Sequence, residues 1–284
     1  MNDDMVATIK LPERIVCMTE ETTEWLYLLE EDWRIVGISG FTVRPPEARK
    51  DKPKVSAFTS AKINKIRDLN PDLVIGFSDM QADIAADLVR AGIPVHICNQ
   101  RSVAEIFSTL LMLGCLVGAE DKARRLLDSY QINLIAIKDA AKKLPSRPTV
   151  YFEEWNDPLI SGIRWVSELI EIAGGNDCFA ELAQHADAKS RIISDPNKVI
   201  ERSPDIIIGS WCGRKFSPTQ VAERDGWGNI PAVRNRQMYE IKSSDLLQPG
   251  PAALTDGIAH IVSIINQWSA TQGGCYGQKY AYCY

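Results

Sequence analysis

The stretch NKIRDLNPDLVIG, residues 64–76, recurs without gaps as NKVIERSPDIIIG, residues 197–209. The two copies share an Asn-Lys start, a Pro-Asp pair and an Ile-Gly end. The same offset aligns Glu20-Glu21 with Glu153-Glu154, and each of these pairs follows a short apolar run. Because the repeating halves are domain-sized and too long for solenoid repeats, the duplication predicts two related lobes with a cleft between them. Small molecules usually bind in such a cleft.

The composition is typical of a globular protein with two cores. The chain has 284 residues, of which 45% are hydrophobic, and this is enough for two domains that each bury a core. A net charge of −5 without a basic stripe argues against nucleic acid or an anionic membrane surface as the partner. No stretch approaches the length of a transmembrane helix. We therefore expect a monomer whose partner is a small molecule.

Cysteine usage and the first residues bear on the cellular location. The seven cysteines are odd in number and lack Cys-x-x-Cys spacing, which is typical of reduced thiols and not of a disulfide framework. Residues 1–5 are acidic and are not followed by the apolar segment of a secretory signal. These features predict a cytoplasmic protein, or a periplasmic one if a signal peptide has been removed.

Hydrophobic patterning predicts alternating strands and helices in the first half. Short apolar, β-branched runs favour buried parallel strands, and spacings of three and four residues favour helices. This alternation predicts a parallel sheet with helices on both faces. The predicted strands are 14–18, 33–38, 73–76 and 95–98, and the predicted helices are 24–30, 63–69 and 82–91.

A long helix separates the two halves. Ser102-x-x-Glu105 is a capping-box pattern that opens a helix to about residue 117, and residues 119–144 continue with helical spacing up to Pro145. The second half again alternates strands and helices, and a final helix follows Pro249-Gly250-Pro251. The predicted fold class is α/β, with two Rossmann-like lobes that have parallel central sheets and are joined by one long connecting α-helix. The predicted domains are an N-terminal lobe at 12–118, the helix at 119–145, a C-terminal lobe at 146–270 and an appended or native tail at 271–284.

Five short motifs occur in order along the chain: Arg34-Ile35-Val36-Gly37-Ile38, Ala91-Gly92-Ile93-Pro94-Val95, Ala173-Gly174-Gly175, Arg202-Ser203-Pro204-Asp205 and Pro249-Gly250-Pro251. Taken together, they resemble the helical-backbone periplasmic binding proteins, which are the cobalamin and iron-siderophore binding components of ABC importers. The resemblance covers roughly residues 12–269 and is closest to the cobalamin-binding branch. It implies a binding protein that holds a cobalamin-like corrinoid in the cleft between its lobes, as a ligand and without a covalent cofactor. An iron-siderophore or another metal chelate is the alternative ligand.

The resemblance breaks at the positions that dock such proteins on a transporter. Family members carry one acidic residue per lobe near the start of the helix before each Pro-Asp strand. The corresponding residues here are Asn64 and Asn197. The sequence therefore predicts that the chain does not dock on a permease, unless Asp68 and Glu201 substitute for the missing carboxylates.

Acidic pairs follow the first strand of each predicted lobe, at Glu20-Glu21 and Glu153-Glu154. Residues after the carboxyl ends of parallel strands lie where α/β sheets bind ligands. These four acids could receive amines, hydroxyls or a cation. Equally, Glu20 and Glu21 could occupy the first turn of a helix, where the macrodipole favours acids.

Aromatic and polar residues at predicted strand ends complete the candidate ligand site. A flat macrocycle requires apolar rings against its faces and hydrogen-bond partners for its edge. Trp155 and Trp211 are the strongest stacking candidates because polar residues surround them, although any single aromatic could instead pack in a core. The other candidates are Phe41, Phe58, Ser78, Asp79, Asn99, Arg101, Trp165, Arg214 and Ser244.

Enzyme and metal-site signatures are weak. The sequence contains no phosphate-binding loop, no dinucleotide fingerprint and no Gly-x-Ser-x-Gly elbow, and the three histidines lack ligand spacing. Cys212 lies close to Arg214 and Lys215, which would lower its pKa and activate it. Free cysteines more often behave as small buried hydrophobes. We therefore predict neither an enzyme nor a protein-bound metal, and we keep a cysteine-dependent enzyme as the second alternative.

Overall fold

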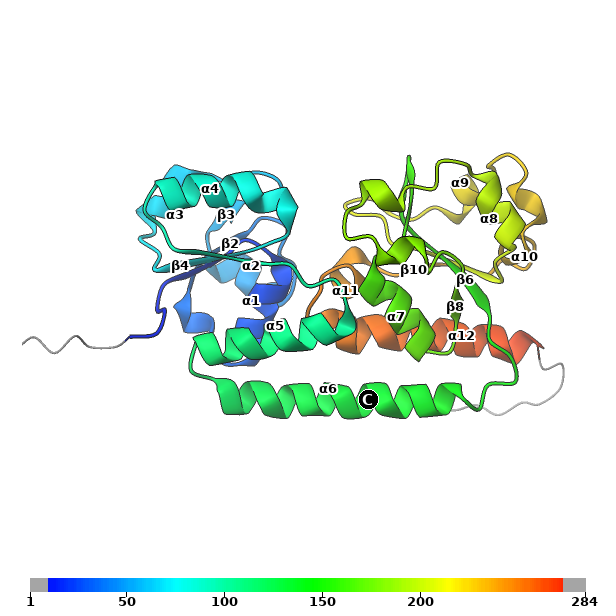
Figure 1. Cartoon of the computed structure of the whole chain (residues 1–284), viewed down its shortest axis with the longest axis horizontal. Coiled ribbons are helices and arrows are strands. Elements are labelled where there is room, and N and C mark those ends of the chain that lie inside the picture. Colours follow the sequence, from blue (N-terminus) through cyan, green and yellow to red (C-terminus); the bar gives the residue numbers. More distant parts are fainter. Residues whose placement is uncertain (1–9, 273–284) are drawn as a thin grey trace, which may run out of the picture. The chain divides into compact units, whose positions relative to one another are not determined.

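The computed structural model describes residues 10–272, and the chain divides into two compact units (Figure 1). Unit 1 comprises the described residues up to Gln131 together with Gln248–Leu254. Unit 2 comprises Ile132–Leu247 and the described residues from Thr255 onward. The predicted C-terminal lobe had included the 248–254 segment, which the structure places with unit 1. The acidic N-terminus and most of the predicted tail, residues 273–284, lie outside the described residues.

Unit 1 contains a five-stranded sheet in the order β3-β2-β1-β4-β5, with every neighbouring pair parallel. The strands are apolar and mostly buried because helices cover both faces of the sheet. The sequence predicted four of these strands and missed β3, whose Lys-Val-Ser sequence has a single apolar residue. The bounds are β1 Ile15–Cys17, β2 Ile35–Ser39, β3 Lys54–Ser56, β4 Leu73–Phe77 and β5 Val95–Cys98.

Helices α3 and α4 begin at the predicted residues, α1 begins at Glu20, four residues before its predicted start, and α2 was not predicted. α3 and α4 pack through Ile66, Ile84 and Leu88 against Val16 and Val74 of the sheet. α5 opens with the predicted capping box, in which the Ser102 hydroxyl accepts the Glu105 backbone N–H and the Glu105 carboxylate accepts that of Ser102. The long helix α6 crosses the boundary between the units. The bounds are α1 Glu20–Leu28, α2 Pro46–Asp51, α3 Ile63–Asp68, α4 Ala82–Arg90, α5 Val103–Leu116 and α6 Glu120–Ala141, with short 3-10 turns at Asp32–Arg34 and Asp79–Gln81.

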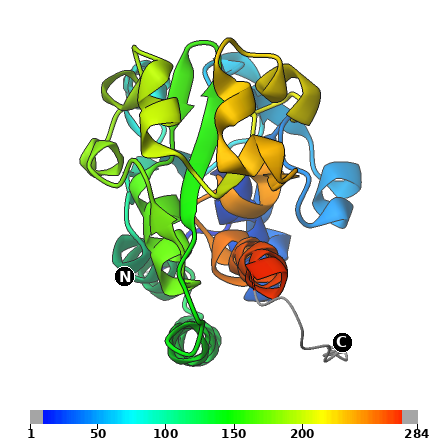
Figure 2. The same cartoon turned by 90° about the vertical axis from the view of Figure 1, so that its right-hand side faces the viewer.

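Unit 2 contains a second sheet in the order β10-β9-β6-β7, and β8 also pairs with β6. β7 alone is antiparallel, because it forms a hairpin with the long strand β6 (Figure 2). The apolar run at residues 150–152 predicts only the first part of β6, because polar residues follow it. The bounds are β6 Thr149–Asn156, β7 Leu159–Ser161, β8 Asn176–Asp177, β9 Ile206–Gly209 and β10 Met238–Glu240.

The core of unit 2 lies between this sheet and short helices. Tyr151, Ile207 and Trp227 are fully buried in it. The predicted final helix begins with a π-helical segment before it becomes regular. The elements are α7 Arg164–Ile172, α8 Asn197–Arg202, α9 Pro218–Ala222, α10 Pro231–Arg234, α11 Ser243–Leu246, the π segment Ala253–Gly257 and α12 Ile258–Gln272, with 3-10 turns at Leu182–Gln184, Lys189–Arg191 and Trp227–Asn229.

The repeated sequence has a physical role in each unit. In unit 1 the Asp72 carboxylate accepts the Glu13 and Arg14 backbone N–H groups at 2.7 and 2.9 Å. In unit 2 the Asp205 carboxylate accepts the Thr149 N–H at 2.9 Å. Each aspartate thus fastens the start of its own strand, β4 or β9, to the start of the adjacent strand, β1 or β6. The repeat therefore encodes the strand register of two separate sheets, which confirms the predicted pair of parallel-sheet units.

Candidate functional site

Three glutamates of unit 1 lie in the first turns of α1, immediately after β1. Helix α1 begins at Glu20, and Glu20, Glu21 and Glu24 are all buried, with Glu21 only 1% exposed. The Thr19 hydroxyl precedes the helix and donates to Glu21 Oε1 at 2.6 Å. The helix-start alternative is therefore the correct description of Glu20 and Glu21, and the dipole of α1 favours their negative charge.

The carboxylates of this turn hold two other segments of unit 1. Glu20 Oε1 accepts the Val43 backbone N–H at 3.0 Å. Glu24 accepts the Arg44 guanidinium at 2.9 Å and the Ala252 backbone N–H at 3.3 Å. Glu21 packs against Gly250, where an added Cβ would lie 2.4 Å from the Cβ of Glu21. The acids thus join the loop after β2 and the 248–254 segment to α1.

Burial changes the protonation of this turn. Desolvation raises the pKa of Glu20 to about 7 and that of Glu21 to about 7, against an ordinary value of 4.5, and the neighbouring carboxylates add to the effect. Burial also raises the pKa of the nearby Cys17 thiol to about 12. At neutral pH, Glu20 and Glu21 therefore carry only part of their charge, which lessens the mutual repulsion of a close acidic group.

The remaining predicted residues of unit 1 differ in exposure. Ser78 is buried in a left-handed conformation at φ 65°, and its hydroxyl accepts the Met80 N–H. Asp79 and Arg101 are brought together as an ion pair at 3.4 Å. Phe41 is 63% exposed, which leaves its ring available to a ligand. Phe58 is half-buried and Asn99 is exposed.

Glu153 of unit 2 is the centre of a buried hydrogen-bond network. Its carboxylate accepts the Trp211 indole N–H at 3.0 Å and the Tyr151 hydroxyl at 3.0 Å. The Arg224 guanidinium donates to both carboxylate oxygens, at 2.6 and 2.8 Å. Glu153 has no exposed surface, and Arg224 balances its charge. This carboxylate therefore organises the interior of unit 2 and is not presented to a ligand.

Glu154 is likewise paired, through the buried guanidinium of Arg191, which donates at 2.6 and 3.1 Å. The predicted set of four carboxylates free to receive a ligand is therefore wrong for Glu153 and Glu154. Arg191 and Arg224 are the partners that the sequence did not reveal. They lie 37 and 71 residues from their glutamates, and no local pattern links them.

The predicted aromatics of unit 2 separate into core and surface residues. Trp211 is 3% exposed and packs edge-on against Phe216, with ring centres 5.1 Å apart. Trp165 is buried in α7 and its indole donates to the Leu246 carbonyl at 2.9 Å. Neither ring offers an open face, so the stacking prediction fails for both residues because each packs in the core. Trp155 is half-buried and packs against the edge of the same core.

The polar residues predicted in unit 2 lie nearer the surface. Arg214 is exposed, and its guanidinium lies 5.3 Å from the centre of the Trp211 ring. Ser244 is half-buried in α11, and its hydroxyl donates to Asp245. Burial of its thiol raises the pKa of Cys212 to about 11, although the residue as a whole is exposed. The activated thiolate required by the enzyme alternative is therefore missing at Cys212.

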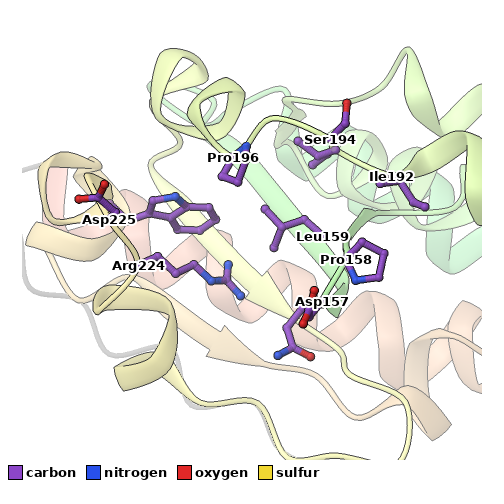
Figure 3. A pocket seen from close by; sticks show the side chains of 11 residues that line it. Asp157, Pro158, Leu159, Ile192, Ser194, Pro196, Arg224 and Asp225 are labelled. Atoms are coloured by element: carbon purple, nitrogen blue, oxygen red, sulfur yellow. The ribbon is translucent and has the colours of Figure 1, made fainter.

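A cavity of about 450 Å³ lies within unit 2 (Figure 3). It opens beside the turn between β6 and β7, and none of the predicted ligand-binding residues lines it. Within residues 10–272, no group of three or more His, Cys, Asp or Glu side chains is placed to hold a metal ion. Nor does this part of the chain include a helix with the length and apolar character needed to cross a membrane. The lining residues are Asn156, Asp157, Pro158, Leu159, Ile192, Ile193, Ser194, Pro196, Arg224, Asp225 and Trp227.

Two units with mainly parallel sheets, each carrying polar and aromatic residues after its strands, define an α/β binding protein. Residues 15–244 match the periplasmic binding protein family, and the chain belongs to it. This agrees with the predicted family and with a binding protein in place of an enzyme.

Three proteins are similar to this chain in sequence or in fold. The chain is 26% identical over 265 residues to the uncharacterized ABC transporter substrate-binding lipoprotein YvrC of Bacillus subtilis, which covers 90% of this chain and 81% of the relative. It is 25% identical to the vitamin B12-binding protein of Vibrio parahaemolyticus, with 85% and 86% covered. The periplasmic heme-binding protein RhuT of Roseiflexus sp. has the same fold, with a TM-score of 0.75, 24% identity, and 89% and 99% covered.

Proposed function

We propose that this protein binds a corrinoid, and that the ligand is held by stacking and by polar contacts without a covalent bond. The relative that carries this proposal is the vitamin B12-binding protein of Vibrio parahaemolyticus, which is similar over most of both chains. The predicted resemblance to the cobalamin-binding branch, made from separate motifs, points to the same ligand.

Two aromatic rings and several polar groups at or after strand ends support this function. Phe41 follows β2 and is largely exposed, and Trp155 lies at the end of β6. Both rings could lie against the apolar face of a macrocycle. Asn99, Arg214 and Ser244 are accessible hydrogen-bond partners for the amides at its edge. In this proposal Glu20 and Glu21 contribute to the site indirectly, by holding the loop after β2 and the 248–254 segment.

The predicted alternative, an iron-siderophore or another metal chelate, has one specific observation in its favour. The loop after β9 carries Arg214 and Lys215, both exposed. Such a basic loop would attract an anionic chelate more strongly than a neutral corrinoid. The heme-binding protein RhuT, which shares the fold, is consistent with a chelate ligand of this kind.

A fluorescence titration tests the two ligand classes. Hydroxocobalamin, hemin and a ferric siderophore are each titrated into the full chain, and tryptophan emission is corrected for ligand absorbance. Saturation at micromolar concentration with hydroxocobalamin alone would support the corrinoid. Saturation only with hemin or the siderophore would move the function to the alternative, and no saturation with any of the three would refute both.

Substitution of Trp155 tests the stacking role. Trp155→Ala should weaken corrinoid binding more than tenfold, because stacked rings contribute more than their buried area. Trp33→Ala is the matched control, since Trp33 is 58% exposed in unit 1 and is not a site candidate. Equal affinity of the Trp155 and Trp33 variants would exclude a stacking role for Trp155.

Delivery to a transporter is a separate question. Asn64 and Asn197 are exposed in the first turns of α3 and α8, and neither supplies a carboxylate. We infer that the chain does not dock on a permease through these positions. Deletion of the gene should then leave uptake of labelled cobalamin unchanged. Lost uptake that the wild type restores, but Asp68→Asn combined with Glu201→Gln does not, would establish docking through those two acids.

The relatives also bear on the cellular location. The lipoprotein and periplasmic relatives favour the extracytoplasmic side over the cytoplasm. We propose the periplasmic alternative. Fractionation of the native host with immunodetection distinguishes a periplasmic from a cytoplasmic location. Recovery of the protein only in the cytosolic fraction would refute the periplasmic location.

A further inference from the structure

We propose that the cavity of unit 2 is a second binding site, and that it takes a small molecule with an apolar body and a protonated amine. The cavity lining shares no residue with the proposed corrinoid site, so either proposal can be refuted without the other. Its volume of about 450 Å³ lies within the range of small-molecule sites, roughly 300–1,000 Å³. It is bounded entirely by unit 2.

One side of the cavity is apolar. Leu159 and Ile193 are buried in the core and line it, and Pro158 and Pro196 extend the same surface. Figure 3 shows Leu159 and Pro196 on one side, with Arg224 and Asp157 on the other. An apolar body of one ring would gain roughly 25 cal/mol per Å² of surface that it buries there.

The polar side offers mainly acceptors. The Asn156 Oδ1 atom is buried and makes no hydrogen bond within the described residues. Asp157 follows it in the turn between β6 and β7, where its backbone carbonyl accepts the Trp155 indole N–H at 2.9 Å. No ion pair to the Asp157 carboxylate is present in residues 10–272. An acceptor without a partner beside an exposed carboxylate suits an ammonium group, which has three donors and no acceptor.

The charge of the cavity selects against anions. Arg224 is the only cationic residue in the lining, and its charge is balanced by Glu153 through two hydrogen bonds. Asp157 and Asp225 then leave the lining with a negative excess. A carboxylate would lose its hydration and meet this excess, whereas an ammonium would be attracted by it.

Three probes that share a phenylethyl group and differ in charge test the site. Phenethylammonium, 2-phenylethanol and 3-phenylpropionate are titrated into the full ¹⁵N-labelled chain while the backbone N–H signals of Asn156 and Asp157 and the Trp227 indole signal are followed. The expected result is saturable shifts with the ammonium, weaker ones with the alcohol and none with the carboxylate. Shifts that are as large with the carboxylate, or no shift with any probe at millimolar concentration, would overturn the proposal.

Two variants locate the charge effect. Asp157→Asn keeps the shape of the turn and should weaken ammonium binding by about fivefold, the upper range for a solvent-exposed ion pair, without changing binding of the alcohol. Glu201→Gln is the control, because Glu201 is an exposed acid of α8 outside the cavity. An equal loss in both variants, or no loss in Asp157→Asn, would refute recognition by Asp157.

Discussion

Replacing Glu21 with glutamine tests how burial controls the acidic turn of α1. Glu21 is 1% exposed and its pKa is raised to about 7 from 4.5 because the charged form is desolvated. A group whose pKa is raised by folding stabilises the protein fully below pH 4.5 and loses this contribution as the pH rises through 7. The wild type should therefore be less stable at pH 8 than at pH 4.5.

The size of the effect follows from the two pKa values. One pKa unit corresponds to about 1.4 kcal/mol, so the difference of about 2.5 corresponds to roughly 3 kcal/mol of unfolding free energy per fully buried carboxyl. Glu21→Gln cannot ionise and keeps an oxygen that can accept the Thr19 hydroxyl. It should match the wild type near pH 4.5 and exceed its stability by about 3 kcal/mol at pH 8.

Urea unfolding followed by circular dichroism at pH 4.5, 6, 7 and 8 measures this difference. Glu47→Gln is the control, because Glu47 also lies in the first turn of a helix but is exposed, and it should follow the wild type at every pH. Part of the pH dependence should persist in Glu21→Gln, since Glu20 titrates in the same range. Identical pH dependence of stability in Glu21→Gln and the wild type would refute the claim that burial raises the pKa of Glu21.

Three further outcomes follow from the same structure. Arg224→Met should lower the free energy of unfolding by about 3–5 kcal/mol in urea, because it leaves the buried Glu153 carboxylate without its cation; a loss below 1 kcal/mol would contradict this. Asp205→Ala should cost about 1–3 kcal/mol by the same assay, since the Thr149 N–H loses its acceptor, and unchanged stability would show that the bond has no structural role. The Cys212 thiol, with its pKa raised to about 11, should react with iodoacetamide at pH 7 more slowly than a free cysteine peptide; a faster reaction would restore the enzyme alternative.

Local features of the chain could be predicted from the sequence. Strand β5 has the predicted bounds, Val95–Cys98, because this short β-branched segment is bounded by Pro94 on one side and polar residues on the other. The capping box at Ser102 and the repeated Pro-Asp pair were also found, since each depends on residues within a few positions or on the repeat itself. Each of these signals can be read directly from the order of residues in the chain.

The candidate site depended on contacts that are distant in sequence. Glu20 and Glu153 occupy equivalent places in the sequence repeat, yet Glu20 follows β1 whereas Glu153 lies within β6. Glu153 is neutralised by Arg224, while Glu20 accepts a backbone N–H of the loop after β2. The same holds for Trp211, whose polar sequence neighbours suggested a surface position although its ring is packed on Phe216. Burial of a charged or aromatic side chain is decided by its partners, and the sequence does not show which residues these are.

The 248–254 segment has a consequence for the order in which the protein is made. Its residues complete unit 1: the Pro249 carbonyl accepts from Gln100, Gly250 packs on Glu21, and the Ala252 N–H donates to Glu24. Translation from the N-terminus produces all five strands of the unit 1 sheet before it reaches this segment. A nascent chain that has passed β5 therefore carries its acidic turn uncovered until nearly all of unit 2 has been synthesised. Ribosome-bound chains stalled before and after residue 254 should differ in how strongly α1 is protected from hydrogen exchange.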